Sequence, residues 1–155
     1  MHKAAAICAD GPILELKEFH KKKVGIITTG NEVYHKRIED TFTPVIKEKL
    51  AEYDTEVIYH EIFDDNHEKI TKGCLTAIEK GADLVICTGG MSVDPDDKTP
   101  LAIKNTGAEI VSYGAPVLPG AMFLLSYYKN DIPILGLPGC VMYAKRTIFD
   151  LVLPR

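Results

Sequence analysis

The chain has 155 residues, 46% of them hydrophobic, and a formal net charge of −4 at pH 7. This length and composition suit one domain with a full hydrophobic core. The acidic balance, and the lack of a basic stripe with interleaved aromatic residues, argue against a nucleic-acid-binding protein. No apolar run approaches the roughly 20 residues that a membrane span needs, and no secretory signal is visible. We therefore expect a cytoplasmic protein with no membrane association.

The cysteines do not form a metal-binding pattern. Cys8, Cys74, Cys87 and Cys140 lack the close spacing of a zinc site. In a reducing compartment they are expected to be free thiols.

The sequence divides into a lead-in segment, residues 1–23, and a domain, residues 24–155. Within the lead-in, residues 12–16 (Pro-Ile-Leu-Glu-Leu) could form a short edge strand. The chain stops just after a helical pattern, so we expect a domain cut from a longer protein.

Predicted strands and helices alternate along the domain. Apolar, β-branched runs indicate strands, and apolar residues at helical spacing indicate amphipathic helices. Strands are predicted over residues 24–28, 56–63, 84–87, 109–113, 123–125 and 132–137, and helices over residues 39–53, 67–80, 100–105 and 141–153. The last helix should turn Ala144, Ile148, Leu151 and Val152 inward.

This alternation predicts the α/β class, with a three-layer α/β/α domain around a mostly parallel central sheet. The runs 24–28 and 84–87 should be interior strands, because their apolar character is unbroken. Residues 116–137 contain no predicted helix, so this stretch should add an antiparallel hairpin.

The stretch 83–100 combines several features of a ligand site. A buried strand ends at Thr88 and is followed by Gly89-Gly90, where the backbone can turn sharply and a ligand can approach closely. Three aspartates follow, and Thr99-Pro100 is typical of a helix start, with Thr99 as the N-cap. Ligands of open α/β sheets bind at such carboxyl ends of strands.

Acidic residues follow three of the predicted strands. Glu32, Asp64 and Asp97 should meet at one edge of a parallel sheet. Mg²⁺ in phosphate-binding sites takes one or two carboxylates together with substrate phosphates, and glycine turns beside helix N-termini suit the phosphates. Taken singly, these acids and glycines are explained by caps, turns and solvated loops. Their shared position after strands favours a site.

Several common motifs are absent. The chain has no Gly-x-Gly-x-x-Gly dinucleotide fingerprint, no Gly-x-x-x-x-Gly-Lys-Ser/Thr phosphate loop and no Gly-x-Ser-x-Gly nucleophile elbow.

From residue 24 to residue 155 the chain resembles the molybdopterin-binding domain family of molybdenum cofactor biosynthesis. The resemblance rests on five motifs that occur in order, each in a loop beside a predicted strand. They are Thr29-Gly30-Asn31-Glu32, Asp64-Asp65, Thr88-Gly89-Gly90-Met91-Ser92-Val93 with Asp97, Pro119-Gly120 and Leu137-Pro138-Gly139.

The resemblance implies transferase chemistry on molybdopterin: either adenylyl transfer from Mg-ATP to the pterin phosphate, or molybdate insertion with release of AMP. It implies catalytic acids at Glu32, Asp64 and Asp97, with Asp64 and Asp97 also holding Mg²⁺. It implies pterin and nucleotide binding at Thr29, Gly30, Thr88, Gly89, Gly90, Ser92, Pro119, Gly120, Pro138 and Gly139. Dimers and trimers are common in similar families.

The chain lacks two lysines of the molybdotransferase pattern. Where that branch has Lys-Pro-Gly-Lys-Pro, this chain has Leu118-Pro119-Gly120-Ala121-Met122, so two lysines that could contact phosphate or molybdate are missing. Two alternatives therefore stay open. One is a non-catalytic cofactor-binding module, and the other is a phosphohydrolase, since related domains occur in proteins that cleave ADP-ribose or process pyridine nucleotides.

Overall fold

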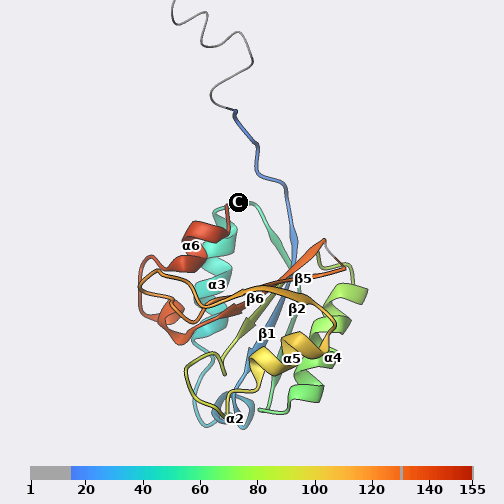
Figure 1. The fold of residues 1–155 in the computed structure, drawn as a ribbon, viewed down its shortest axis with the longest axis vertical. Helices are drawn as coiled ribbons and strands as arrows, with labels where there is room; N and C mark the ends of the chain where they lie inside the picture. Colours follow the sequence, from blue (N-terminus) through green and yellow to red (C-terminus); the bar gives the residue numbers. More distant parts are fainter. Residues whose placement is uncertain (1–14, 130, 155) are drawn as a thin grey trace, which may run out of the picture.

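A six-stranded sheet forms the middle layer of the computed structural model, which describes residues 15–129 and 131–154 (Figure 1). The strands are β1 (Lys23–Thr29), β2 (Glu56–Phe63), β3 (Leu84–Thr88), β4 (Glu109–Tyr113), β5 (Leu124–Tyr128) and β6 (Ile132–Leu137). Their order is β2-β1-β3-β6-β5-β4. The first four strands in this order run parallel, and β5 and β4 extend the sheet in antiparallel fashion. The predicted mostly parallel sheet with an antiparallel hairpin is confirmed.

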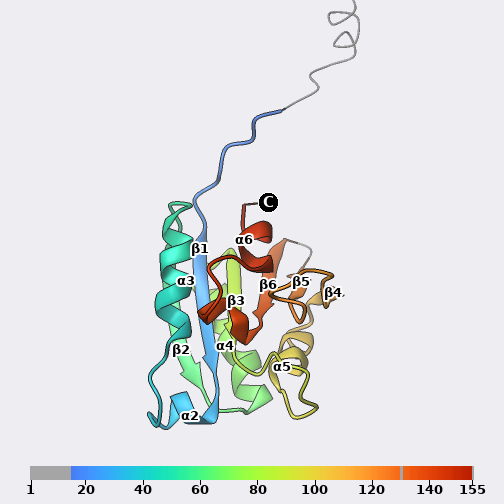
Figure 2. The same cartoon turned by 90° about the vertical axis from the view of Figure 1, so that its left-hand side faces the viewer.

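Helices cover both faces of the sheet (Figure 2). On one face lie α4 (His67–Glu79) and α5 (Thr99–Asn105), whose buried residues join one hydrophobic cluster with the sheet. On the other lie α3 (Phe42–Ala51), the short 3₁₀ helix η1 (Gly139–Met142) and α6 (Ile148–Val152), which belong to a second cluster. The three-layer architecture is therefore confirmed. No described helix has the length and apolar character needed to cross a membrane.

β1 and β3 lie side by side in the interior of the sheet. All five residues of β3 are buried, and β1 is buried from Val24 to Thr29. A strand covered by helices on both faces can be apolar throughout, which explains the unbroken runs in the sequence. The carboxyl ends of both strands therefore emerge together, at fixed positions, where the candidate site lies.

α3 is shorter than predicted. It begins at Phe42 rather than residue 39, because the carboxylate of Asp40 accepts hydrogen bonds from the backbone N–H groups of Phe42 and Thr43, each at 3.0 Å. A further one-turn helix, α2 (Asn31–Tyr34), follows β1 and was not predicted.

The predicted helix over residues 141–153 is wrong. The chain forms η1, then an irregular segment, then α6. Thr147 ends the irregular segment with a capping box. Its side chain accepts a hydrogen bond from the N–H of Phe149, and the carboxylate of Asp150 accepts one from the N–H of Thr147. The restart changes which residues face inward: Phe149 is buried, whereas Leu151, expected inside, is 54% exposed.

The lead-in contributes little to the described core. Residues 15–22 are exposed and form no strand, so the predicted edge strand is not found at residues 15–16, while residues 12–14 lie outside the described part. Phe19 makes an edge-to-face contact with Tyr53, with ring centroids 5.1 Å apart.

A polar cluster ties the start of α3 to the sheet. The imidazole Nε2 of His60 lies 2.9 Å from the hydroxyl of Thr43 and 3.3 Å from that of Thr28, and Thr43 also donates to Asp40. Burial lowers the pKa of His60 below its usual value, an effect that Asp40 opposes and Lys47 reinforces. The neutral imidazole is therefore the form that fits the folded protein.

The His60 cluster predicts a specific acid sensitivity. Because the unfolded chain binds a proton on this imidazole more readily than the folded protein, the free energy of unfolding should be constant above the ordinary histidine pKa of about 6.5 and should fall as the pH drops through it. Urea unfolding at pH 7.5 and at pH 5.5 measures the change. His60→Gln should reduce the difference between the two pH values, whereas His20→Gln, at an exposed lead-in position, should leave it unaltered. Equal pH dependence in both variants would contradict this account.

Candidate functional site

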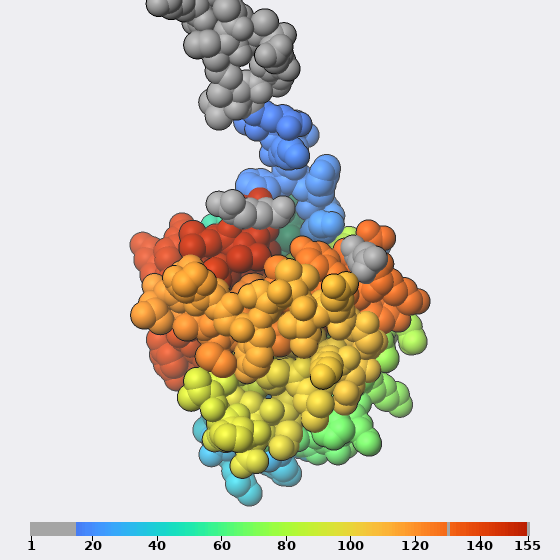
Figure 3. Space-filling model, viewed as in Figure 1, coloured from blue at the N-terminus to red at the C-terminus, as the bar shows by residue number. Residues whose placement is uncertain are grey.

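A pocket of about 540 Å³ lies at the carboxyl ends of β1 and β3. Three segments contribute to it: residues 29–33 at the end of β1 and just beyond, Asp65 after β2, and residues of the 90–98 loop after β3. Ile38 and Phe42 complete it on the side of α3. In the space-filling view, the yellow-green loop after β3 lies beside the blue and cyan segment that follows β1, at the lower end of the molecule (Figure 3). The predicted placement of these loops at one edge is thus observed.

The glycine turn after β3 is forced by a close approach to β1. Gly89 has φ of +84°, and a Cβ at this position would overlap the carbonyl oxygen of Thr29. Gly90 has φ of +53°, and its Cβ would lie 2.9 Å from the hydroxyl oxygen of Thr99. Both positions therefore require glycine for steric reasons, independently of any ligand.

Thr99 locks this turn, a role that the sequence reading missed. The N-cap of α5 is Lys98, so the prediction of Thr99 as N-cap is wrong. The side chain of Thr99 is instead buried, and its hydroxyl donates to the carbonyl of Gly89 at 2.8 Å. It also lies 3.2 Å from the hydroxyl of Thr29, which must then be the donor of that second bond. A threonine before proline gives no sign of such a distant partner.

Asp97 organises the acidic loop internally. Its Oδ2 accepts hydrogen bonds from the backbone N–H of Ser92 at 2.6 Å and from the Ser92 hydroxyl at 2.8 Å. Asp94 in turn accepts from the backbone N–H of Asp96 at 2.9 Å. Both donor groups of Ser92, which we predicted to contact a ligand phosphate, are directed at Asp97. A phosphate bound at Ser92 would have to compete with this carboxylate.

The two aspartates after β2 have separate roles. Asp65 lines the pocket, and its Oδ2 accepts from the backbone N–H of Asn31 at 3.2 Å. Asp64, which we predicted to be the functional acid, is not among the lining residues. Its Oδ2 forms an ion pair with Lys69 at 2.7 Å, and its Oδ1 is buried with no hydrogen-bond partner. An additional donor or a cation would satisfy that oxygen.

The expected convergence of Glu32, Asp64 and Asp97 is not observed as a metal-ligating group. Within residues 15–129 and 131–154, no three histidine, cysteine or acidic side chains are arranged to hold a metal ion. Glu32 and Asp97 do line the same pocket. Since Mg²⁺ needs only one or two carboxylates when phosphates and water complete its coordination, the donor set is compatible with this ion.

The two later motifs lie outside the pocket lining. Pro119 and Gly120 pack on the start of α6: the carbonyl of Pro119 accepts from the N–H of Ile148 at 3.1 Å, and a Cβ on Gly120 would overlap the Ile148 side chain. Pro138 precedes η1, and Gly139 has open space where a Cβ would be. Packing explains the first pair of residues, whereas the second leaves room for a ligand.

Thr88 is the remaining predicted binding residue, and its environment is unusual. The side chain is fully buried at the end of β3, and its hydroxyl oxygen has no hydrogen-bond partner. Such a group is costly unless something outside the described contacts satisfies it.

The pocket carries a strong negative charge. Its carboxylates are Glu32, Asp65, Asp94, Asp96 and Asp97, and its one lining cation is Lys98. An anionic ligand would be repelled here unless a cation accompanied it.

A model of the family described as "Probable molybdopterin binding domain" matches residues 25–155. The chain belongs to the molybdopterin-binding domain family. The match includes the loops after β1, β2 and β3 that line the pocket, so the site described above is the region in which the family likeness and the geometry coincide.

Individual relatives include proteins named for molybdopterin and one that is not. A molybdopterin molybdenumtransferase of Haemophilus influenzae is 31% identical over 92% of the chain and 36% of its own length. A competence-damage inducible protein of Bacillus velezensis is 36% identical over 55% of the chain and 20% of its own length. The crystal structure of the molybdopterin biosynthesis enzyme MoaB from Thermus thermophilus superposes with a TM-score of 0.72 at 28% identity, covering 86% of this chain and 90% of that one. The chain thus spans about a third or less of these two curated relatives.

The close contact at Gly89 predicts that a single added methyl group there will destabilise the protein. Gly89→Ala should lower the free energy of unfolding by more than about 2 kcal/mol, because the new Cβ meets a backbone carbonyl and the residue must keep a positive φ. Chemical denaturation measures the loss. Gly139→Ala is the matched control, since its Cβ enters open space and should change stability by about 0.5 kcal/mol or less. Equal stability of the two variants would refute the steric argument.

Proposed function

We propose that this domain binds molybdopterin at the acidic pocket and takes part in group transfer on the pterin phosphate during molybdenum cofactor assembly. The observation that carries the proposal is the glycine turn fixed against Thr29 beside Asp97, within the motif that the family shares. The turn brings bare backbone to the pocket, where Gly90 is a lining residue. Backbone of this kind lets a phosphate approach closely.

The chemistry we infer is adenylyl transfer or molybdate insertion on the adenylylated pterin. Both bring anionic groups together in a pocket that already contains five carboxylates. Mg²⁺ held by Asp97, and by Asp64 if its side chain turns from Lys69 towards the pocket, would supply the positive charge that this arrangement lacks. Asp97 has one oxygen engaged by Ser92 and so retains a lone pair for a cation, whereas Asp64 would have to turn because its Oδ2 is paired with Lys69 and its Oδ1 is buried.

The chain's own residues would position the reactants. Glu32 lies on the first turn after β1 and lines the same pocket as the 90–98 loop, where it could accept a proton or orient the pterin. Lys98 is the one lining cation and could contact a phosphate oxygen. ATP, AMP and molybdate are further proposed ligands, and a dimeric or trimeric assembly and a cytoplasmic location remain predictions.

Asp97→Asn tests the catalytic form of the proposal. Asparagine keeps the shape and an acceptor oxygen for Ser92 but removes the charge, so Mg²⁺-dependent turnover should fall by roughly two orders of magnitude while the fold persists. The assay follows adenylylated pterin formed from molybdopterin and Mg-ATP, and in a second reaction AMP released from adenylylated molybdopterin with molybdate. Asp131→Asn, in the turn between β5 and β6, controls for loss of one charge. Full activity of Asp97→Asn would defeat this mechanism.

A second candidate is a non-catalytic cofactor-binding module. It is favoured by the single lining cation and by the alanine at position 121, which leaves phosphate and molybdate few positive partners. Thermal shift with molybdopterin, ATP and ADP-ribose, each with and without Mg²⁺, separates the possibilities. Molybdopterin binding without turnover supports the module. Binding and cleavage of ADP-ribose would support the phosphohydrolase alternative instead.

A further inference from the structure

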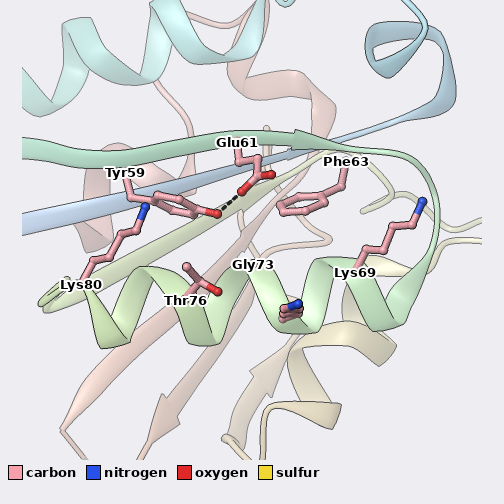
Figure 4. Close-up of a pocket in the computed structure, with 8 residues that line it drawn as sticks. Tyr59, Glu61, Phe63, Lys69, Gly73, Thr76 and Lys80 are labelled. Carbon is pink, nitrogen blue, oxygen red and sulfur yellow. Dashed lines mark hydrogen bonds between the residues drawn. The ribbon is translucent and has the colours of Figure 1, made fainter.

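A second groove, of about 360 Å³, lies between the edge strand β2 and α4 (Figure 4). It shares no lining residue with the acidic pocket. Tyr59, Glu61 and Phe63 enter it from β2 at alternate positions, as expected for one face of a strand. Nothing in the proposed function uses this groove.

The floor of the groove is apolar. The ring of Phe63 lies directly over Gly73 of α4, where a Cβ would come within 2.5 Å of the ring. Gly73 therefore lets an aromatic side chain lie flat against the helix. Tyr59 forms a second aromatic wall, the Glu61 carboxylate lies between the two rings, and Thr76 lies on the helix beneath Tyr59 (Figure 4).

The rim of the groove is basic. Lys69, Lys72 and Lys80 all line it from α4 and its C-terminal end. Lys80 lies 4.4 Å from the centre of the Tyr59 ring, and Lys69 is paired with Asp64. The one acidic lining residue, Glu61, accepts a hydrogen bond from the Tyr59 hydroxyl. The groove thus carries a positive charge on a protein whose net charge is −4.

The lysines are spread out rather than convergent. Lys69 and Lys80 are eleven positions apart, which corresponds to about 16 Å along a helix axis. A single small phosphate cannot contact both ends. The first and fifth residues of an extended peptide lie about 13 Å apart, at roughly 3.3 Å per residue, and the long lysine side chains can cover the difference.

The edge of β2 offers such a peptide hydrogen-bonding partners. Among the described residues, β2 pairs with β1 alone and is the terminal strand of the sheet. Alternate N–H and C=O groups along a terminal strand point away from its neighbour and can pair with an added strand. The side chains of an added strand that face α4 would enter the groove.

We propose that this groove docks an extended acidic segment of a partner protein, which adds to the free edge of β2 as a further strand. The segment has acidic residues at its first and fifth positions, next to the lysines at the two ends. Its third position is apolar and lies between the rings of Tyr59 and Phe63, over the Glu61 carboxylate that the Tyr59 hydroxyl engages (Figure 4). Charged residues often protect edge strands from unwanted pairing. Here three of the four charged lining residues are lysines and the fourth, Glu61, accepts a hydrogen bond from Tyr59, so the groove disfavours basic strands and favours acidic ones.

A peptide-binding experiment on the 155-residue chain tests the proposal. The probe is a fluorescein-labelled, acetylated peptide with the core Asp-Thr-Val-Thr-Asp, followed by fluorescence anisotropy at low ionic strength. We expect saturable binding that weakens with added salt, and no binding of the Lys-Thr-Val-Thr-Lys peptide. The double variant Lys72→Glu, Lys80→Glu should weaken binding about tenfold or more, since each reversal replaces an attraction with a repulsion. Lys104→Glu, an exposed lysine on α5, should bind the peptide normally.

Backbone methylation separates strand addition from simple charge attraction. Two further peptides carry N-methyl groups, one on both threonines and the other on the alternate set of residues. One set of N–H groups should face β2, so one peptide should lose binding and the other should keep it. Equal binding by both methylated peptides, or equal binding by the Lys72→Glu, Lys80→Glu variant, would overturn the proposal. Displacement of the peptide by inorganic pyrophosphate near the peptide's own Kd would assign the groove to small anions and likewise overturn it.

Discussion

The candidate site depends on the contact between the backbone of Gly89 and the carbonyl of Thr29. No side chain fits between these two positions, so the turn after β3 passes directly against the end of β1. The hydroxyl of Thr99, at the start of α5, then fixes the turn by hydrogen bonding to the carbonyl of Gly89 and to the hydroxyl of Thr29. With the turn held, the segment carrying Glu32 and the loop carrying Asp97 become two sides of one pocket. Removing the close approach would separate the residues on which any chemistry there depends.

The sequence predicted the parts of the fold that depend on local pattern. The apolar runs of β1 and β3 identified interior strands because each is buried on both faces, and a stretch without helical spacing identified the β5–β6 hairpin. It failed where a distant contact overrides the local pattern. The helical spacing after residue 141 is genuine, but the Thr147 cap and the ion pair between Asp150 and Lys49, at 2.5 Å, start a new helix instead of continuing the first.

The same distinction applies to the site. The glycine turn and Asp97 were found because strand ends followed by glycine and acidic residues are a local signal. Thr99 was assigned to a cap because its partners, Gly89 and Thr29, are remote in sequence. The choice of Asp64 over Asp65 could not be made from adjacent identical residues, since only the turn after β2 decides which carboxylate meets the pocket and which meets Lys69.

Charge is separated over the surface between the two recesses. The pocket at the strand ends is acidic and the groove beside β2 is basic, and the ion pair of Asp64 with Lys69 joins the loop after β2 to the lysine row of α4. Asp64 therefore has one oxygen committed to the groove and one buried oxygen without a partner. A cation bound at that second oxygen would weaken the hold of Asp64 on Lys69, because the carboxylate's charge would then be shared. An acidic chain near Lys69 would compete for the same ammonium group from the other side. Occupation of the groove would thus be felt at the loop after β2, which also carries the pocket residue Asp65.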